Sequence, residues 1–355
     1  MRIIIAVLKR IALLLLPIFY ALAAGGVLIL AAGADPFVTY WSLFRSGFSC
    51  APGAGRCALV TALTFATPLI LAGLSATVAL RAGFFSIGQA GQMMVGAAAA
   101  TWIGSRVLLP ADVHPALALF AAMVFGGLWG LVPAMLKEYV GVNEILSTLL
   151  LNPISGMVIG FFPMGRLAGT ALLEPLIHST KLSAGIFISL GAVLFVLVYY
   201  WRTTRGLEIR ANAHAPRFAR YAGITAHLPI LRAMLLSGAL AGLAGAVEVL
   251  GVQYHFVTTY SAFTDFDGLI VAFVGHLHPL GVVIVGILLG GLRFGAITGL
   301  QIGSHIPREL GGAIIALILL FVATNRLSRP FAGLFARITP PPGRRGALPH
   351  DGKTG

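Results

Sequence analysis

Apolar runs close to the length of a membrane crossing follow one another through most of this sequence. A helix needs about 20 apolar residues to cross the hydrocarbon core of a bilayer. Of the 355 residues, 58% are hydrophobic and only 10% are charged, whereas soluble domains carry about 25% charged residues. This pattern excludes a water-soluble globule and a disordered chain. We therefore expect an all-α polytopic membrane protein.

About ten crossings are predicted. The eighth run is too short to cross alone, so we expect a tilted helix or a half-helix that lines a cavity inside the protein. A faint similarity between 64–136 and 230–320 is consistent with an internal repeat, although Gly- and Ala-rich helices also resemble one another by composition alone. The predicted spans are 11–32, 58–80, 84–105, 113–136, 141–163, 184–201, 230–252, 264–276, 279–302 and 309–325.

The distribution of basic residues predicts the orientation. The net charge of +13 would point to a nucleic-acid partner in a soluble protein, but in a membrane protein Lys and Arg concentrate on the cytoplasmic side. With the N-terminus inside, 17 Lys and Arg residues fall in inner segments and six in outer segments, while Arg293 lies within a span. Both termini are therefore predicted to be cytoplasmic, and we expect no nucleic-acid partner.

Three regions follow from this topology. Residues 1–57 form a first transmembrane helix and an outer loop, 58–325 form the transmembrane domain with a cytoplasmic loop at 202–232, and 326–355 form a disordered cytoplasmic tail. Cys50 and Cys57, the chain's two cysteines, fall in the outer loop. An oxidising compartment permits a disulfide there, and the alternative is two unlinked small residues. Neither lies in a Cys/His cluster, so no metal site is expected.

The loop 202–232 contains two short helical patterns. Pro216 fits the first turn of the second helix, and Gly223 suits its C-terminal end. Helical spacing then produces an apolar face beside basic residues. Such a helix can dock into a groove of a soluble partner or lie on anionic lipid. The apolar face consists of Phe218, Tyr221 and Ala222, and the basic residues are Arg217 and Arg220.

This loop also carries a family resemblance. It reads Thr-Arg-Gly-Leu-Glu-Ile-Arg-Ala at 204–211 and Pro-Arg-Phe-Ala-Arg-Tyr-Ala-Gly-Ile at 216–224. The two segments resemble the ATPase-docking loop of binding-protein-dependent ABC importer permeases, in the branch that contains ribose, branched-chain amino-acid and nucleoside permeases. Further stretches resemble its simple-sugar/nucleoside subgroup, and the resemblance covers about residues 60–325. These stretches are 83–92 (Gly-Phe-Phe-Ser-Ile-Gly-Gln-Ala-Gly-Gln), 141–152, 237–251 and 266–275.

The resemblance implies the permease subunit of an ATP-driven importer in a bacterial inner membrane, moving a small polar solute, with a nucleoside or simple sugar favoured. The implied partners are a cytoplasmic ABC ATPase, a second permease subunit (identical or homologous), an extracytoplasmic substrate-binding protein and membrane lipid. ATP and Mg²⁺ would bind to the ATPase, so this chain binds no cofactor and is not an enzyme. The implied ATPase-coupling residues are Arg205, Gly206, Glu208, Arg210, Arg217, Arg220, Tyr221 and Gly223.

Polar residues within the spans are candidates for the substrate path, because buried polar groups in a membrane face the bundle interior. Gln89 and Gln92 share one helix face with Ser86. Their amides can bind a sugar or a base that stacks on Phe84 and Phe85, or they can join neighbouring helices.

Three further polar positions have two interpretations each. Asn152 can bind a neighbouring helix or the substrate. Asn143 and Glu144 begin the fifth span, where capping the helix is favoured over substrate contact. Glu248 can pair with Arg293 or another donor, or line the path. An ion-coupled secondary transporter is the alternative function, and it would need a coupling group near the midplane, for which Glu248 is the candidate.

Overall fold

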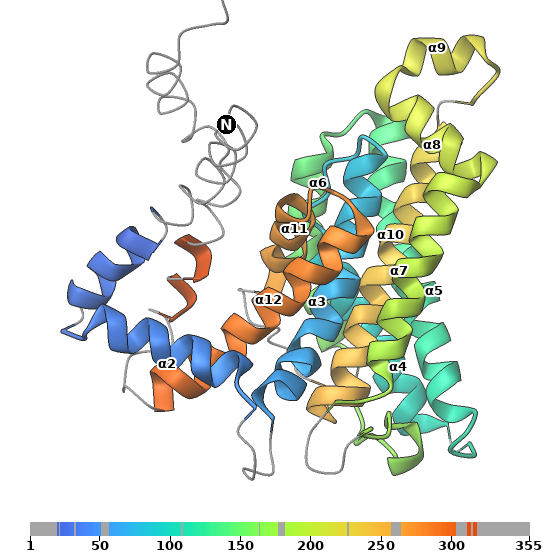
Figure 1. Ribbon diagram of the computed structural model, residues 1–355. Helices are drawn as coiled ribbons and strands as arrows, with labels where there is room; N and C mark the ends of the chain where they lie inside the picture. Colours follow the sequence, from blue (N-terminus) through green and yellow to red (C-terminus); the bar gives the residue numbers. More distant parts are fainter. Residues whose placement is uncertain are drawn as a thin grey trace, which may run out of the picture.

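The computed structural model describes residues 20, 22–31, 33–50, 57–107, 109–162, 164–176, 182–225, 227–256, 264–302, 311–313 and 315–317. This part of the chain is a bundle of helices (Figure 1). Its elements are α2 (Pro36–Phe48), α3 (Ala58–Arg81), α4 (Gln89–Arg106), α5 (His114–Met135), η1 (Leu136–Val140), α6 (Glu144–Gly160), η2 (Gly169–Ala171), α7 (Gly185–Arg202), α8 (Thr204–His214), α9 (Pro216–Tyr221), α10 (His227–Glu248), η3 (Val249–Gln253), α11 (Thr264–Val274), α12 (Pro279–Gly295) and η4 (Ala296–Ile302).

Five helices of the described residues are long and apolar enough to cross a membrane. Each coincides with a predicted span. A sixth would be formed by Leu22–Ala31 together with α2 if this pair, bent by 113°, is one broken span. The five helices are Ala58–Arg81, His114–Val140, Gly185–Arg202, His227–Gln253 and Pro279–Leu300.

Two predicted spans are shorter than expected. The helix predicted at 84–105 begins only at Gln89, because Gly83 turns the chain with a φ of 78°. The run at 141–163 forms the 17 residues of α6. The eighth run was predicted to be short, and α11 has 11 residues. Most of 11–32 and of 309–325 lies outside the described residues.

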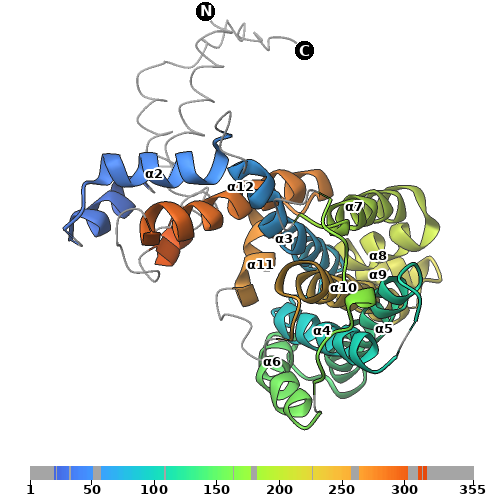
Figure 2. The ribbon, with the colours of Figure 1, turned by 90° about the horizontal axis from the view of Figure 1, so that it is seen from below.

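Helix α2 corrects the prediction of a loop over 33–57. Asp35 caps the helix by accepting a hydrogen bond from the N–H of Phe37 at 2.8 Å, and Pro36 occupies its first position. The helix packs against α12 and η4 (Figure 2). It was missed because its 13 residues are too few for a span. Its buried residues are Thr39, Leu43 and Gly47.

A disulfide joins the two cysteines that flank the segment between α2 and α3. The Cα atoms of Cys50 and Cys57 lie 4.4 Å apart. Cys57 also precedes the first residue of α3. The link therefore holds the end of α2 close to the start of α3.

Helices α3 and α10 form the centre of the bundle. Helix α3 packs against α7, α11 and α12, while α10 packs against α4 and α5 (Figure 2). The two central helices are joined by a hydrogen bond of 3.0 Å between the buried hydroxyls of Ser75 and Ser237. Glycines bring α5 and α10 together, since a Cβ on Gly126 would lie 2.6 Å from the carbonyl oxygen of Gly238. Such close backbone contacts drive helix association in membranes.

Candidate functional site

The helix pair α8–α9 lies beyond one end of α7 and α10 (Figure 1). Thr203 begins it, because its hydroxyl accepts a hydrogen bond from the N–H of Gly206 at 3.1 Å. Gly206 packs directly on the last turn of α7, where an added Cβ would lie 2.8 Å from the Cα of Tyr200. Only glycine fits this contact, so the start of α8 is tied closely to α7.

Helix α9 begins and ends at the residues that the sequence predicts. Pro216 occupies its first position. Gly223 follows its end with a φ of 80°, a conformation that favours glycine. The N–H of Ile224 then donates to the carbonyl of Ala219 at 2.9 Å, which closes the end of the helix. The turn fixes the direction in which the chain leaves α9.

The predicted apolar face of α9 is directed outward. Phe218 is 69% exposed and Tyr221 is 92% exposed, while Ala219 is fully buried. Arg217 and Arg220 are exposed beside them. Two aromatic side chains between arginines form a surface that can enter an apolar groove with an acidic rim.

The remaining predicted coupling residues lie on α8 at different depths. Arg205 is exposed, whereas Glu208 and Arg210 are partly buried. Glu208 accepts a hydrogen bond from Arg232 of α10 at 2.9 Å. The structure therefore places seven of the eight predicted residues on one helix pair and Gly223 directly after it, but their side chains contact different neighbours.

A cluster beside α8 was not predicted. The Nε of Arg81, at the end of α3, donates to the carbonyl of Leu277, and its guanidinium lies 4.8 Å from the centre of the Trp201 ring. His276 and Leu277 both have a φ of 54°, so the turn between α11 and α12 is backbone-strained. The cluster joins the ends of α3 and α7 to this turn. The sequence did not predict this role of Arg81, because an Arg at the end of a span is common.

The second candidate site is the first turn of α4. Gln89 and Gln92 are each 1% exposed. Both side-chain polar atoms of Gln89, and Oε1 of Gln92, have no hydrogen-bond partner among the described residues. Buried polar groups are normally hydrogen-bonded, and an unpaired one costs about 1–3 kcal/mol. These amide atoms therefore have hydrogen-bonding capacity that the described residues do not use, although they are buried from solvent.

Helix α6 holds the segment that leads into α4. The amide of Asn152 donates to the carbonyl of Ile87 at 2.9 Å and accepts from the N–H of Gly91 at 2.9 Å. The hydroxyl of Thr148 accepts from the N–H of Ile87 at 3.2 Å. This geometry favours the helix-binding interpretation of Asn152. Thr148 was missed, although Thr148 and Asn152 are spaced i, i+4 on one face of an apolar helix.

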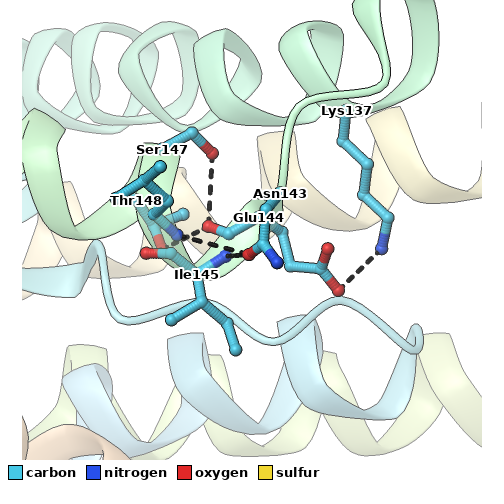
Figure 3. A network of polar contacts seen from close by, with 7 residues as sticks. Lys137, Asn143, Glu144, Ile145, Ser147 and Thr148 are labelled. Carbon is cyan, nitrogen blue, oxygen red and sulfur yellow. Dashed lines mark hydrogen bonds and ion pairs between the residues drawn. The ribbon is translucent and has the colours of Figure 1, made fainter.

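The start of α6 carries a further polar network (Figure 3). Asn143 caps the helix by accepting from the N–H of Ile145 at 2.9 Å, as the capping interpretation expects. Glu144 forms an ion pair of 3.0 Å with Lys137, and its carbonyl accepts from Thr148 at 2.7 Å. The network fixes α6 against the end of η1, so that Thr148 and Asn152 keep their places beside α4.

The other predicted path residues separate into two groups. Phe84 is fully buried, and the ammonium nitrogen of Lys137 lies 4.8 Å from the centre of its ring. The ring centre of Phe85 lies 6.2 Å from that of Phe273. Both precede α4 and lie near Gln89. Glu248 accepts a hydrogen bond from Gln253 at 2.9 Å.

Glu248 lies away from the first turn of α4. Helices α4 and α10 run alongside each other. A Cβ added to Gly96 would collide with the backbone of Gly242, and one added to Gly104 would lie 3.9 Å from Leu250, in η3 directly after α10. This places Glu248 beside the second half of α4. Arg293, a proposed partner of Glu248, instead forms an ion pair with Asp267 of α11. No group of three His, Cys, Asp or Glu side chains that could hold a metal ion occurs in the described ranges.

Comparison with known proteins bears on most of the chain. The family described as "Branched-chain amino acid transport system / permease component" matches residues 58–323. The guanosine ABC transporter permease protein NupP of Bacillus subtilis is 35% identical over 89% of this chain and 95% of its own length. No solved structure matches the chain.

Two further relatives have similar coverage. The glucose ABC transporter permease protein TsgB13 of Haloferax volcanii is 31% identical over 89% of this chain and 88% of its own length. The nucleoside ABC transporter permease protein NupB of Lactococcus lactis subsp. cremoris is 30% identical, over 89% of this chain and 92% of its own. All three matches reach beyond the loop 202–232.

Proposed function

We propose that this chain, which belongs to the family of branched-chain amino acid transport system permease components, imports a nucleoside or a simple sugar. It is the multi-pass membrane permease subunit of an ABC importer and has no catalytic role of its own; a partner subunit hydrolyses ATP. This family membership decides against the ion-coupled alternative.

The observation that carries the substrate proposal is the pair of buried amides at the first turn of α4. Gln89 and Gln92 offer donors and acceptors that have no protein partner within the described residues. A nucleoside or a sugar presents hydroxyl and ring atoms that such amides can bind, and a base can stack on an aromatic side chain such as Phe85. The names of the relatives, which cover guanosine, nucleosides and glucose, support the same class.

The partner proposal depends on the helix pair α8–α9. Of the eight coupling residues, we assign Arg217, Arg220 and Tyr221 to contact with a cytoplasmic ATPase, because these side chains of α9 are exposed. We assign the other five to the attachment and orientation of the helix pair. Helix α8 is joined to α7 through Gly206 and to α10 through Arg232. A displacement of α8 by the ATPase would therefore act on two long helices at once, which can bias inward- against outward-facing states.

The finer topology is also part of the proposal. We propose ten crossings in a bacterial inner membrane, with both termini cytoplasmic, a second permease subunit and an extracytoplasmic binding protein. An internal repeat is supported by a reciprocal packing, in which α3 contacts α11 and α12 while α10 contacts α4 and α5. In both proposed repeats, α3 to α5 and α10 to α12, the third helix continues as a π-helix: η1 follows α5, and η4 follows α12.

Co-purification and uptake test the two parts separately. The tagged full-length chain, produced with its ATPase, is extracted in mild detergent, and the recovered ATPase is quantified. We expect Tyr221→Ala with Arg217→Glu to lower recovery at least several-fold. Phe187→Ala, which changes a 64%-exposed aromatic at the start of α7, is the matched control and should leave recovery unchanged. Equal recovery from both variants would refute the docking assignment.

The substrate is tested in vesicles that contain the complete importer and ATP. We expect ATP-dependent uptake of guanosine or of glucose, with competition from compounds of the preferred class. Uptake of neither would refute the substrate class while leaving the ATPase result intact.

A further inference from the structure

A hollow of about 350 Å³ opens between the end of α7, the first turn of α8 and the early turns of α10. It is separate from the first turn of α4 and from the aromatic face of α9. The residues that line it are Tyr199, Arg205, Arg232, Leu235, Leu236 and Ala239.

The lining changes from charged to apolar along one face of α10. Arg232, Leu235 and Ala239 are spaced i, i+3 and i+7, so they lie in a row on that face. Arg232 is nearest the start of the helix, and the apolar residues follow in the direction of the span. Leu235 is 42% exposed, and Leu235 and Ala239 border Gly127 of α5. Both lie further along a helix that is long and apolar enough to cross a membrane, so this part of the hollow lies at the depth of acyl chains.

The charged part of the hollow retains a positive charge. Arg232 and Glu208 form an ion pair, with side chains 40% and 36% exposed. Arg205 is exposed and has no carboxylate partner within the part of the chain that the structure describes. Tyr199 lines the hollow together with Arg205 and Arg232. One guanidinium in excess, beside a tyrosine hydroxyl, is a suitable environment for an anion such as a phosphate.

The hollow also lies at the level where a lipid headgroup is found. Helix α7 ends at Arg202 and α10 begins at His227, and both helices are long and apolar enough to cross a membrane. Arginines at the ends of spans extend toward the headgroup region, and basic pockets between transmembrane helices bind anionic headgroups. A free anion would use only the arginines, whereas a phospholipid would also cover Leu235 and Ala239.

From this combination we propose that the hollow is a binding site for an anionic phospholipid. The lipid phosphate contacts Arg205 and Arg232, and an acyl chain lies along Leu235 and Ala239. Since Arg205 belongs to the first turn of α8, the bound lipid holds the helix pair α8–α9 against the bundle. This inference goes beyond the import function, and its central measurement needs neither the ATPase nor the transported solute.

Native mass spectrometry of the purified full-length chain can test the site. The protein is incubated with phosphatidylglycerol or, separately, with phosphatidylcholine of the same acyl chains, and the retained lipids are counted. We expect preferential retention of phosphatidylglycerol. The variant Arg205→Gln/Arg232→Gln should lower that retention about tenfold, because one to two charge-assisted hydrogen bonds are lost.

The matched control is Arg217→Gln/Arg220→Gln, which removes the same charge from the exposed surface of α9. It should retain phosphatidylglycerol like the unmodified chain. Equal losses in the two variants would mean a general attraction to charge and would overturn the site. A charge-preserving variant, Arg205→Lys/Arg232→Lys, should keep most of the retention, and this separates loss of binding from loss of folding.

Two competition arms separate a lipid from other occupants. Excess inorganic phosphate should not displace phosphatidylglycerol, because it leaves the apolar wall uncovered; displacement would show a simple anion site and refute the lipid proposal. Addition of the purified ATPase should leave the retained lipid in place. Its displacement by the ATPase would show that the hollow is a protein contact instead.

Discussion

Arg232 of α10 donates a hydrogen bond to Glu208 of α8 over 2.9 Å, and this ion pair joins the helix pair α8–α9 to a central helix of the bundle. Both side chains are more than one third exposed. Ion pairs of this kind contribute at most about 1 kcal/mol to stability. We therefore expect this pair to affect the orientation of α8 more than the stability of the fold.

Breaking this ion pair should impair the coupling of ATP hydrolysis to uptake. We expect Glu208→Arg to lower ATP-dependent uptake several-fold, because two guanidinium groups would repel each other across α8 and α10. The exchanged variant Glu208→Arg/Arg232→Glu should recover part of the uptake, with thermal unfolding almost unchanged throughout. If the exchange recovers nothing while the single variant is impaired, Glu208 acts on a different partner.

Gly206 should tolerate no side chain. A Cβ there would collide with the carbonyl of Tyr199 and lie 2.8 Å from the Cα of Tyr200. We expect Gly206→Ala to destabilise the start of α8 by about 1–3 kcal/mol and to reduce co-purification of the ATPase. Gly191→Ala is the matched control in α7, where no described atom lies within 4 Å of the added Cβ. Normal ATPase recovery from Gly206→Ala would contradict the close contact.

Asn152 should stabilise the chain through the backbone of the segment before α4. Replacing it with Ala leaves the carbonyl of Ile87 and the N–H of Gly91 without their partner, at about 1–3 kcal/mol for each group that stays dry. Asn152→Asp keeps the acceptor for Gly91 but sets a carboxylate oxygen against the carbonyl oxygen of Ile87, so it should also lose stability, and more at neutral pH than at acidic pH, where a protonated carboxyl can donate to that carbonyl. Thermal unfolding in detergent measures both variants. Unfolding of Asn152→Ala at the temperature of the unmodified chain would contradict this role.

We expect the amide of Gln92 to contribute to solute uptake but not to the stability of the fold. Its buried Oε1 has no partner among the described residues, so Gln92→Leu should leave the unfolding temperature unchanged or raise it. The same variant should lower solute uptake several-fold, while ATPase recovery stays normal. A lower unfolding temperature with normal uptake would instead mean that Gln92 holds neighbouring helices together.

Much of the fold follows from local sequence. Apolar runs predict the five long helices, because a span must satisfy its own backbone in lipid and therefore forms a helix wherever the run is long enough. Pro216 and Gly223 predict the bounds of α9 for a similar local reason, since both residues restrict or permit one backbone conformation. Helix α2 was missed because its 13 residues are too few for a span and because its burial depends on packing against α12 and η4.

The two sites differ in how far the sequence determines them. By itself, the sequence determined that this protein crosses the membrane many times, and it marked the loop 202–232 and the amides of Gln89 and Gln92 as its polar features. Only the tertiary structure decided which amides have partners: α6 satisfies Asn152, whereas Gln89 remains buried without a partner in the described part of the chain. Hydropathy depends on neighbours along the chain, but hydrogen bonding between helices depends on residues about 60 positions apart.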